Sequence, residues 1–513
     1  MLNMDDQIKG KKTLRLAVYL SLLLVAGFYF SITVEIFNSP VRIGLSDVFL
    51  PFALILIIFD VWKSKNIPVL NIKYGWMLII AISIWLSASF AIGFYNSGVI
   101  HQWALFNKLI GWFVLVTYLF CGAWICNNCI IRKESFLKIF ICIAFFIALY
   151  SLMYHWQVTN NQLWYLFHEY QKFIMHQYVP SSGDIYRGLE EQYIYYYSNR
   201  VEGFSYNPNA FGLIMACVFV LHISFVDRNE LFKKKSYYLI STIILLAIYY
   251  SSSRSTWVGL ALGVAVIVLM NKKILKPVFF SIVLCFLCNI IIFNHNVLFT
   301  FNTSNLAKHF DRALIENIEV SDVKRSSGFA QDSPTKPRRK TINNIYILND
   351  LKPNSSACSE GLAESIKTAI YESTWYRRLT NSNSLKPRIE TYMLALKYWT
   401  EDPIIGVGLG VFSWRSQLEG GNPSGDVLHN TALWLLAETG IIGLVLFSLF
   451  FLACIRSLIS ESKNKSSLSI SILGLIFVML GASIGTEILY QRYLWFFIGL
   501  ALAYKQKDMV KRT

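Results

Sequence analysis

Charged side chains are scarce in this chain of 513 residues, where they make up 15% of the total, with 31 Asp and Glu against 47 Lys and Arg. No Asp-x-Asp triplet occurs anywhere, and the segments that we expect to face outward from a membrane hold no acidic cluster. Divalent cations are bound in proteins mainly through carboxylate oxygens. The sequence therefore argues against a transferase that binds a sugar nucleotide through a metal ion.

Other site motifs are present only in part. The two CxxC pairs at 126–129 and 285–288 have no second ligand pair nearby, so we expect no zinc site. The GVGLG segment at 406–410 lacks the third glycine of GxGxxG and follows no soluble strand, which argues against nucleotide binding. The chain also shows no internal repeat, which disfavours a transporter built from paired halves.

Long polar stretches are also rare, because 55% of the residues are hydrophobic and the mean hydropathy is +0.45. The apolar residues form long blocks, and a helix needs roughly 20 of them to cross the hydrocarbon layer. We therefore predict an all-α integral membrane protein with about 12 transmembrane helices. The blocks cover residues 14–31, 45–61, 74–92, 104–126, 136–156, 208–226, 237–252, 256–271, 277–294, 430–455, 467–485 and 492–504.

The positive residues behind the net charge of +16 are distributed as the predicted topology requires. Lys and Arg cluster in alternate connections between the blocks, as the positive-inside rule requires if both termini are cytoplasmic. We therefore predict membrane lipids and no nucleic acid among the partners. The clusters lie at Lys63/Lys65/Lys73, Arg132/Lys133/Lys138, Arg228/Lys233/Lys234/Lys235, Lys272/Lys273/Lys276, Arg456/Lys463/Lys465 and Lys505/Lys507/Lys511/Arg512.

Two outward connections divide the chain. Residues 1–294 form an N-terminal transmembrane region with an outward loop at 157–207. Residues 295–428 form a large outward loop, in which 302–385 is polar and predicted to be a flexible insertion. Residues 429–513 carry the C-terminal membrane helices.

The end of the large loop has a different pattern. Ile389, Tyr392, Met393, Leu396 and Trp399 recur at helical spacing, and Pro403 follows them. This pattern predicts a short amphipathic helix on the outer membrane surface, which Arg388 opens.

His429 stands at the outer mouth of the span at 430–455. On a continuous helix, positions 429, 433, 436, 440 and 443 share one stripe, and Gly440 and Gly443 would let a neighbouring helix approach it closely. An imidazole with an unperturbed pKa of about 6.5 can take a proton from a hydroxyl near neutral pH. The alternative is a histidine that merely caps the helix.

Three arginines occupy outward helix ends, although positive residues are depleted there. Arg200, Arg254 and Arg388 could each reach toward lipid headgroups, but together with a histidine they indicate an anionic site. The arginine fork matches phosphate geometry.

Three further ionisable side chains lie in or near the last spans. Glu487 and Arg492 lie near the outer ends of the last two spans, where they could pair or line one cavity. Glu438, inside a span, is interpreted as structural.

Four segments resemble, in order, the O-antigen ligase and polymerase superfamily. They are RVEGFSYNPNAFG at residues 200–212, SSSRSTWVGL, RIETYMLALKYWTEDPIIGVGLGVF and HNTALWLLAETGIIGL. The most specific is His429-Asn430, nine residues, then Gly-x-x-Gly at 440–443. The resemblance covers roughly residues 200–445.

The resemblance implies a glycosyltransferase-C type fold in the bacterial inner membrane, with the site facing the periplasm. It implies glycan transfer from undecaprenyl diphosphate to an acceptor sugar, with no cofactor, metal or nucleotide. By motif, Arg254 and Arg388 become donor-diphosphate residues and His429 the catalytic base, with Arg200 added by position and Asn430, Glu487 and Arg492 in support. The long polar insertion departs from the family pattern.

Three functions remain as alternatives. A ligase would join finished O-antigen to lipid A-core, and a polymerase would extend the glycan on its carrier. A multi-span transporter is disfavoured because the ionisable residues collect at the outer face and not at mid-membrane.

Overall fold

The computed structural model describes residues 12–36, 39–65, 67–72, 74–128, 133–160, 200–205, 207–225, 235–289, 386–418, 428–462 and 466–503. The chain divides into two compact units, one of Met1–Ile282 with Ser359–Thr513 and a second of Val283–Cys358. Only 283–289 of the second unit is described, and the predicted insertion at 302–385 lies outside the described residues, as does most of the predicted loop at 157–207.

A helix is present at each predicted apolar block. The helices are α1 (Lys12–Gly27), α2 (Leu45–Ser64), α3 (Gly75–Ser97), α4 (Gln102–Ala104), the π-helix η1 (Leu105–Ile110), α5 (Gly111–Asn128), α6 (Lys133–Asn160), η2 (Gly203–Ser205), α9 (Pro208–Phe225), α10 (Lys235–Ser251), α11 (Arg254–Met270), η3 (Lys272–Ile274), α12 (Leu275–Cys288), α16 (Lys386–Glu401), α17 (Val411–Leu418), α18 (Thr431–Ser462), α19 (Ser467–Ala482) and α20 (Arg492–Leu502).

Five helical stretches in the described part of the chain are long and apolar enough to cross a membrane: Leu45–Ser64, Gly75–Ser97, Gln102–Asn128, Ser135–His155 and Thr431–Ser462. Six other apolar helices are shorter. The structure therefore confirms a mostly helical membrane protein, and the count of about 12 spans stays a prediction.

A β-hairpin departs from the all-α expectation. Strands β1 (Ser31–Ile36) and β2 (Ser39–Gly44) pair antiparallel between α1 and α2, with Val34 opposite Val41. The apolar pattern predicts only the end of one span and a connection here. The β-branched residues of this segment favour extended backbone, and the pairing satisfies backbone groups that no helix would use.

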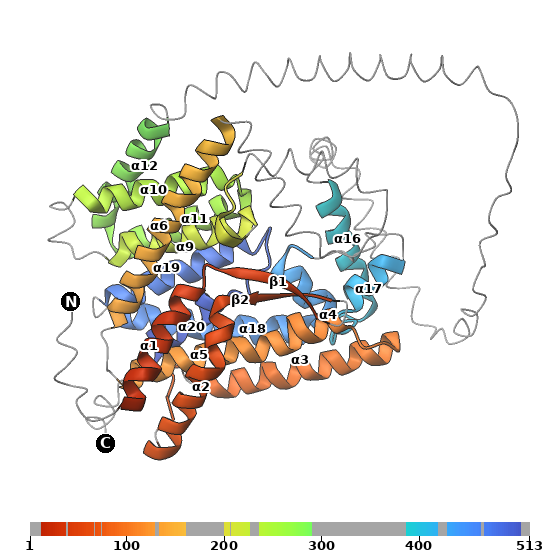
Figure 1. The fold of residues 1–513 in the computed structure, drawn as a ribbon. Coiled ribbons are helices and arrows are strands. Elements are labelled where there is room, and N and C mark those ends of the chain that lie inside the picture. The colour runs from red at the N-terminus through yellow and green to blue at the C-terminus, as the bar shows by residue number, and fades with distance from the viewer. Residues whose placement is uncertain are drawn as a thin grey trace, which may run out of the picture. The chain divides into compact units, whose positions relative to one another are not determined.

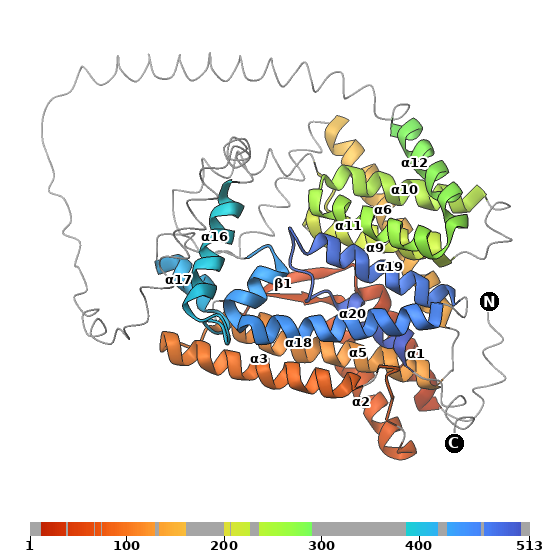
Figure 2. The same cartoon turned by 180° about the vertical axis from the view of Figure 1, so that it is seen from behind.

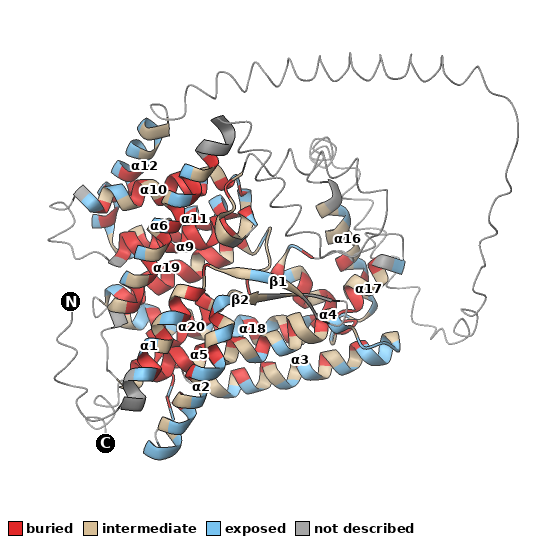
Figure 3. Ribbon diagram, viewed as in Figure 1, coloured by how far each residue is buried: buried red, intermediate tan, exposed pale blue. Residues whose placement is uncertain are grey.

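The most deeply buried helices lie at the centre of the bundle. α5 packs against α20, and α19 packs against α9. The buried residues gather on these four helices in Figure 3. By contrast, α2 and α3 expose large apolar side chains such as Phe52, Ile55, Met77 and Ile84. Apolar surface on that scale marks a face made for lipid or another protein.

The connections between helices form two groups, and contacts join connections within each group. In one group, Asn71 Nδ2 donates to Glu461 Oε1 at 2.8 Å and Ser457 Oγ donates to the Asn71 carbonyl at 2.6 Å. In the other, Phe30 and Phe204 rings lie 5.0 Å apart and Val201 N donates to the Tyr250 carbonyl. The second group contains the predicted outward connections, so the alternation agrees with the proposed topology, whose orientation stays a prediction.

Helix α18 is broken at Gly440, which has φ 64° and ψ −170°. The continuous stripe expected for residues 429–443 is therefore wrong beyond residue 439. Segment 403–408 inserts at the break, and α3 and α18 run side by side below it (Figures 1 and 2). A β-carbon at Gly440 would lie 2.5 Å from the Ile404 carbonyl carbon, so the glycine admits a loop and not a neighbouring helix.

The inserted segment replaces the hydrogen bonds that the break removes. Ala437 and Glu438 carbonyls accept from Val407 N at 2.9 Å and Gly408 N at 3.1 Å. In return, Ile441 N donates to the Pro403 carbonyl at 3.0 Å. Backbone groups inside a membrane must all be paired, so a broken helix needs such a partner.

The GVGLG segment owes its glycines to this insertion. Gly406, Gly408 and Gly410 have φ of 74°, 99° and 86°, a region where only glycine is unstrained. A β-carbon at Gly408 would also lie 2.9 Å from the Ile92 carbonyl carbon of α3. These glycines therefore serve close backbone packing, which agrees with the rejection of a nucleotide loop.

Candidate functional site

The start of α18 is covered by the connection between α19 and α20, residues 483–491. Thr431 N donates to the Ser483 carbonyl at 3.1 Å, and Ile488 N donates to Thr431 Oγ1 at 3.1 Å. Asn430 caps the helix, because its Oδ1 accepts from Leu433 N at 3.0 Å. Its Nδ2 donates to the Ile484 carbonyl at 3.2 Å. Asn430 therefore positions its neighbour His429 through the backbone.

His429 lies just before α18, where its side chain keeps an exposed face. Tyr392 of α16 donates to the His429 carbonyl at 3.3 Å and to the Ile484 carbonyl at 2.9 Å. Partial burial lowers the pKa of His429; Arg388 and Lys108 lower it further, while Glu487 raises it. The imidazole is therefore held neutral at pH 7, the form that a general base needs.

Arg388 and Arg254 flank the first part of the 483–491 connection. A β-carbon at Gly485 would lie 3.6 Å from Arg388 Nη1 and 3.1 Å from Ser255 Cβ. Ser255 Oγ and Thr486 Oγ1 are 3.0 Å apart, which anchors the N-terminus of α11, where Arg254 is exposed. The structure thus places Arg388 beside this connection, together with the immediate neighbours of Arg254 and His429. A shared anionic site of the three residues stays a prediction.

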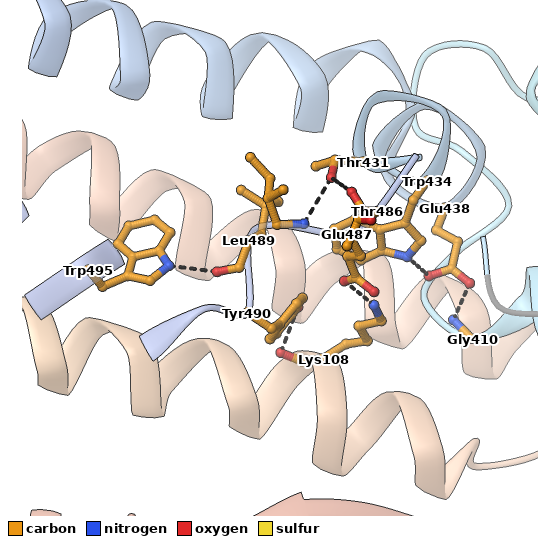
Figure 4. Close-up of polar contacts among 11 residues, drawn as sticks. Lys108, Gly410, Thr431, Trp434, Glu438, Thr486, Glu487, Leu489, Tyr490 and Trp495 are labelled. Atoms are coloured by element: carbon orange, nitrogen blue, oxygen red, sulfur yellow. Dashed lines mark hydrogen bonds and ion pairs between the residues drawn. The ribbon is translucent and has the colours of Figure 1, made fainter. Parts of the chain in front are cut away.

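The second part of this connection holds a buried ion pair (Figure 4). Glu487 pairs with Lys108 of η1, whose side chain is 2% exposed. The ammonium lies 4.3 Å from the Trp434 ring centroid, 4.7 Å from Tyr490 and 4.9 Å from Trp103. These rings attract the cation through their quadrupoles. Tyr490 also donates to the Lys108 carbonyl at 3.0 Å.

Lys108 is a candidate site residue that the sequence patterns above do not single out. The sequence does contain a signal that could have identified Lys108, because a lysine inside the predicted span at 104–126 is costly unless it has a function or a partner. It also lies in a π-helix, a form of backbone that is frequent at functional sites.

Two other predicted site residues have different contacts. Arg200 Nε donates to the Ser251 carbonyl at 2.8 Å and its Nη2 to Asn209 Oδ1 at 2.9 Å. These bonds tie the segment before α9 to the end of α10. Arg492 pairs with Asp47, with Nε 2.6 Å from Oδ1. Arg492 and Glu487 therefore each have an ion-pair partner other than the one suggested, Asp47 for Arg492 and Lys108 for Glu487.

A cavity of about 570 Å³ connects the two ion pairs. Both pairs line it, so the suggestion that Glu487 and Arg492 share a cavity is confirmed. Most of the rest of its wall comes from residues 28–31, β2, the start of α9 and the segment from Trp103 to Leu115.

Glu438 has structural contacts. Its Oε1 accepts from Gly410 N at 3.0 Å and its Oε2 from Trp434 Nε1 at 2.7 Å, so it links the inserted loop to the aromatic cage of Lys108. Within the described part of the chain, no three His, Cys, Asp or Glu side chains could hold a metal ion together. The expectation of a metal-independent reaction stays a prediction.

Comparison with known proteins adds the family. A family model described as O-Antigen ligase matches residues 239–448, which include Arg254, Arg388 and His429. The match supports the O-antigen ligase superfamily for this part of the chain. The same match supports a membrane glycosyltransferase of the O-antigen ligase or polymerase type. No curated protein and no solved structure matches it. Lys108 and Glu487 lie outside the region matched to the O-antigen ligase model.

Proposed function

We propose that this O-antigen ligase-type protein moves a glycan from undecaprenyl diphosphate to an acceptor sugar of lipid A-core, at the periplasmic face of the bacterial inner membrane. The observation that carries the proposal is the placement of a histidine with a lowered pKa beside Arg388 and the N-terminus of α11, at the end of a candidate span.

The proposed reaction assigns a role to each group. The acceptor oxygen attacks the anomeric carbon of the donor, and the bond from that carbon to the diphosphate oxygen breaks. His429 takes the acceptor hydroxyl proton, and the resulting imidazolium is stabilised by the carboxylate of Glu487. Arg254 and Arg388 bind the departing diphosphate, whose charge grows as the bond breaks. Asn430 holds the histidine in place through its helix cap.

His429→Ala tests the base. Losing a general base typically costs ~10²–10⁴-fold in rate, so glycan transfer by the purified protein should fall by that factor, while membrane yield stays unchanged. The thermal unfolding of the His429→Ala protein, compared with that of the wild type, is the control for local folding. Transfer at the wild-type rate by the His429→Ala protein would remove the histidine from the mechanism.

A polymerase is the second candidate, because the family match fits both activities. The lipopolysaccharide banding of a deletion strain separates them. A ligase deletion should leave unmodified lipid A-core and carrier-linked glycan of full length. A polymerase deletion should leave lipid A-core that carries a single repeat.

A further inference from the structure

We propose that the cavity between the β-hairpin, η1 and the start of α20 is a subsite for an uncharged sugar of the acceptor. This inference rests on the proposed glycan transfer. It adds to that transfer the place and the chemical class of the acceptor unit.

The cavity has the size of a small-molecule site. Its volume of about 570 Å³ falls within the range of roughly 300–1,000 Å³ for such sites. Aromatic side chains supply apolar, flat faces, onto which the C–H face of a sugar ring can pack. They include Phe28, Phe30, Trp103, Phe106, Phe211 and Tyr490.

The charges on the wall cancel. Asp47 is paired with Arg492, and Glu487 with Lys108, and all four side chains line the cavity. A diphosphate would meet no excess of positive charge there, in contrast to the arginine side of the connection. The donor diphosphate and the uncharged sugar therefore have separate binding sites.

The same ion pairs disfavour an alkyl chain as the occupant. A hydrocarbon packed over Asp47–Arg492 would remove water from charged groups and return no hydrogen bonds, which is costly. Sugar hydroxyls both donate and accept, so they can replace that water. Part of the wall is aliphatic, because Val114 and Ile214 line it. An alkyl chain is therefore the occupant that the experiment has to exclude.

The 483–491 connection separates the two sites. Near its start, Gly485 lies beside Arg388, and Thr486 contacts Ser255. Of its later residues, Glu487, Tyr490 and Gln491 line the cavity. A single displacement needs the attacking oxygen opposite the leaving group. An acceptor in the cavity would approach past Glu487, while the diphosphate leaves toward the arginines.

Binding can be measured directly with the full chain in lipid nanodiscs. The probes are the methyl glycosides of glucose, galactose, mannose and N-acetylglucosamine, with octanol as the alkyl probe, followed by saturation-transfer NMR. Val114→Trp and Val41→Trp add bulk inside the cavity from two independent elements. Phe113→Trp is the matched control, because Phe113 lies next to Val114 on α5 but is 48% exposed and outside the cavity wall.

We expect saturation of at least one glycoside by the wild type and by Phe113→Trp, and its loss in both cavity variants. In transfer assays the cavity variants should raise the acceptor KM by about tenfold or more, equivalent to one or two lost hydrogen bonds, with an unchanged donor KM. Saturation of octanol alone, glycoside signals that survive both cavity variants, or an unchanged acceptor KM would each overturn the subsite.

These outcomes separate the subsite from the proposed function. A wild-type protein that binds glycosides in the cavity but transfers no glycan would refute the transfer reaction and keep the subsite. A protein that transfers glycan with the same acceptor KM in all three variants would refute the subsite and keep the transfer reaction.

Discussion

Removing Lys108 should destabilise the protein strongly, because it leaves a carboxylate unpaired inside the structure. The Lys108 side chain is 2% exposed and that of Glu487 is 17% exposed. Breaking a buried ion pair by deleting one partner costs about 3–5 kcal/mol. Since Glu487 keeps some contact with solvent, we expect about 3 kcal/mol for Lys108→Met, whose side chain still fills the aromatic cage.

A double-mutant cycle isolates the pair from the packing. Glu487→Gln leaves a buried ammonium among three rings and should cost about 2–3 kcal/mol. The double variant has no unpaired charge, so it should be no less stable than either single variant, with a coupling free energy of about 3 kcal/mol or more.

The assay is a denaturant titration of the purified full chain in one fixed lipid and detergent mixture. Lys272→Met, at an exposed lysine of η3, is the control and should change stability by less than about 0.5 kcal/mol. If the two single costs simply add in the double variant, Lys108 and Glu487 do not interact and the caged pair is refuted.

Three further predictions concern the arginines and the inserted loop. Arg388→Gln removes a charge that lowers the pKa of the imidazole, so the acid limb of the transfer rate, which follows protonation of the base, should move to higher pH; a limb that stays in place would exclude the coupling. Arg254→Lys keeps the positive charge but loses the planar guanidinium fork, so it should weaken donor binding more than Arg456→Lys at the predicted cytoplasmic face. Equal donor affinities of the two variants would show that Arg254, like Arg456, serves only the membrane topology. Gly408→Ala, at φ 99° against α3 backbone, should lower the unfolding temperature by several degrees more than Gly98→Ala, at φ 67° with open space around it; equal losses would show that only the dihedral angle matters.

Local patterns in the sequence determined the helices and the motif residues. A helix is observed at each apolar block that the sequence predicted, since a span is defined by consecutive residues. The spacing from Ile389 to Trp399 and the following Pro403 predicted α16, which ends at Glu401. The sequence singles out His429 because its position at the mouth of an apolar run is itself a local feature, and its role stays a prediction.

Tertiary structure decided which charges meet. Lys108 and Glu487 are 379 positions apart, and nothing local marks them as partners. The break at Gly440 depends on backbone groups that segment 403–408 supplies from outside the helix. A glycine in an apolar run predicts that another segment packs closely against it, but that segment can be a helix or a loop. Only the folded chain shows which of the two it is. Pairing over long sequence distances is set by how the helices pack, which periodicity along one helix does not encode.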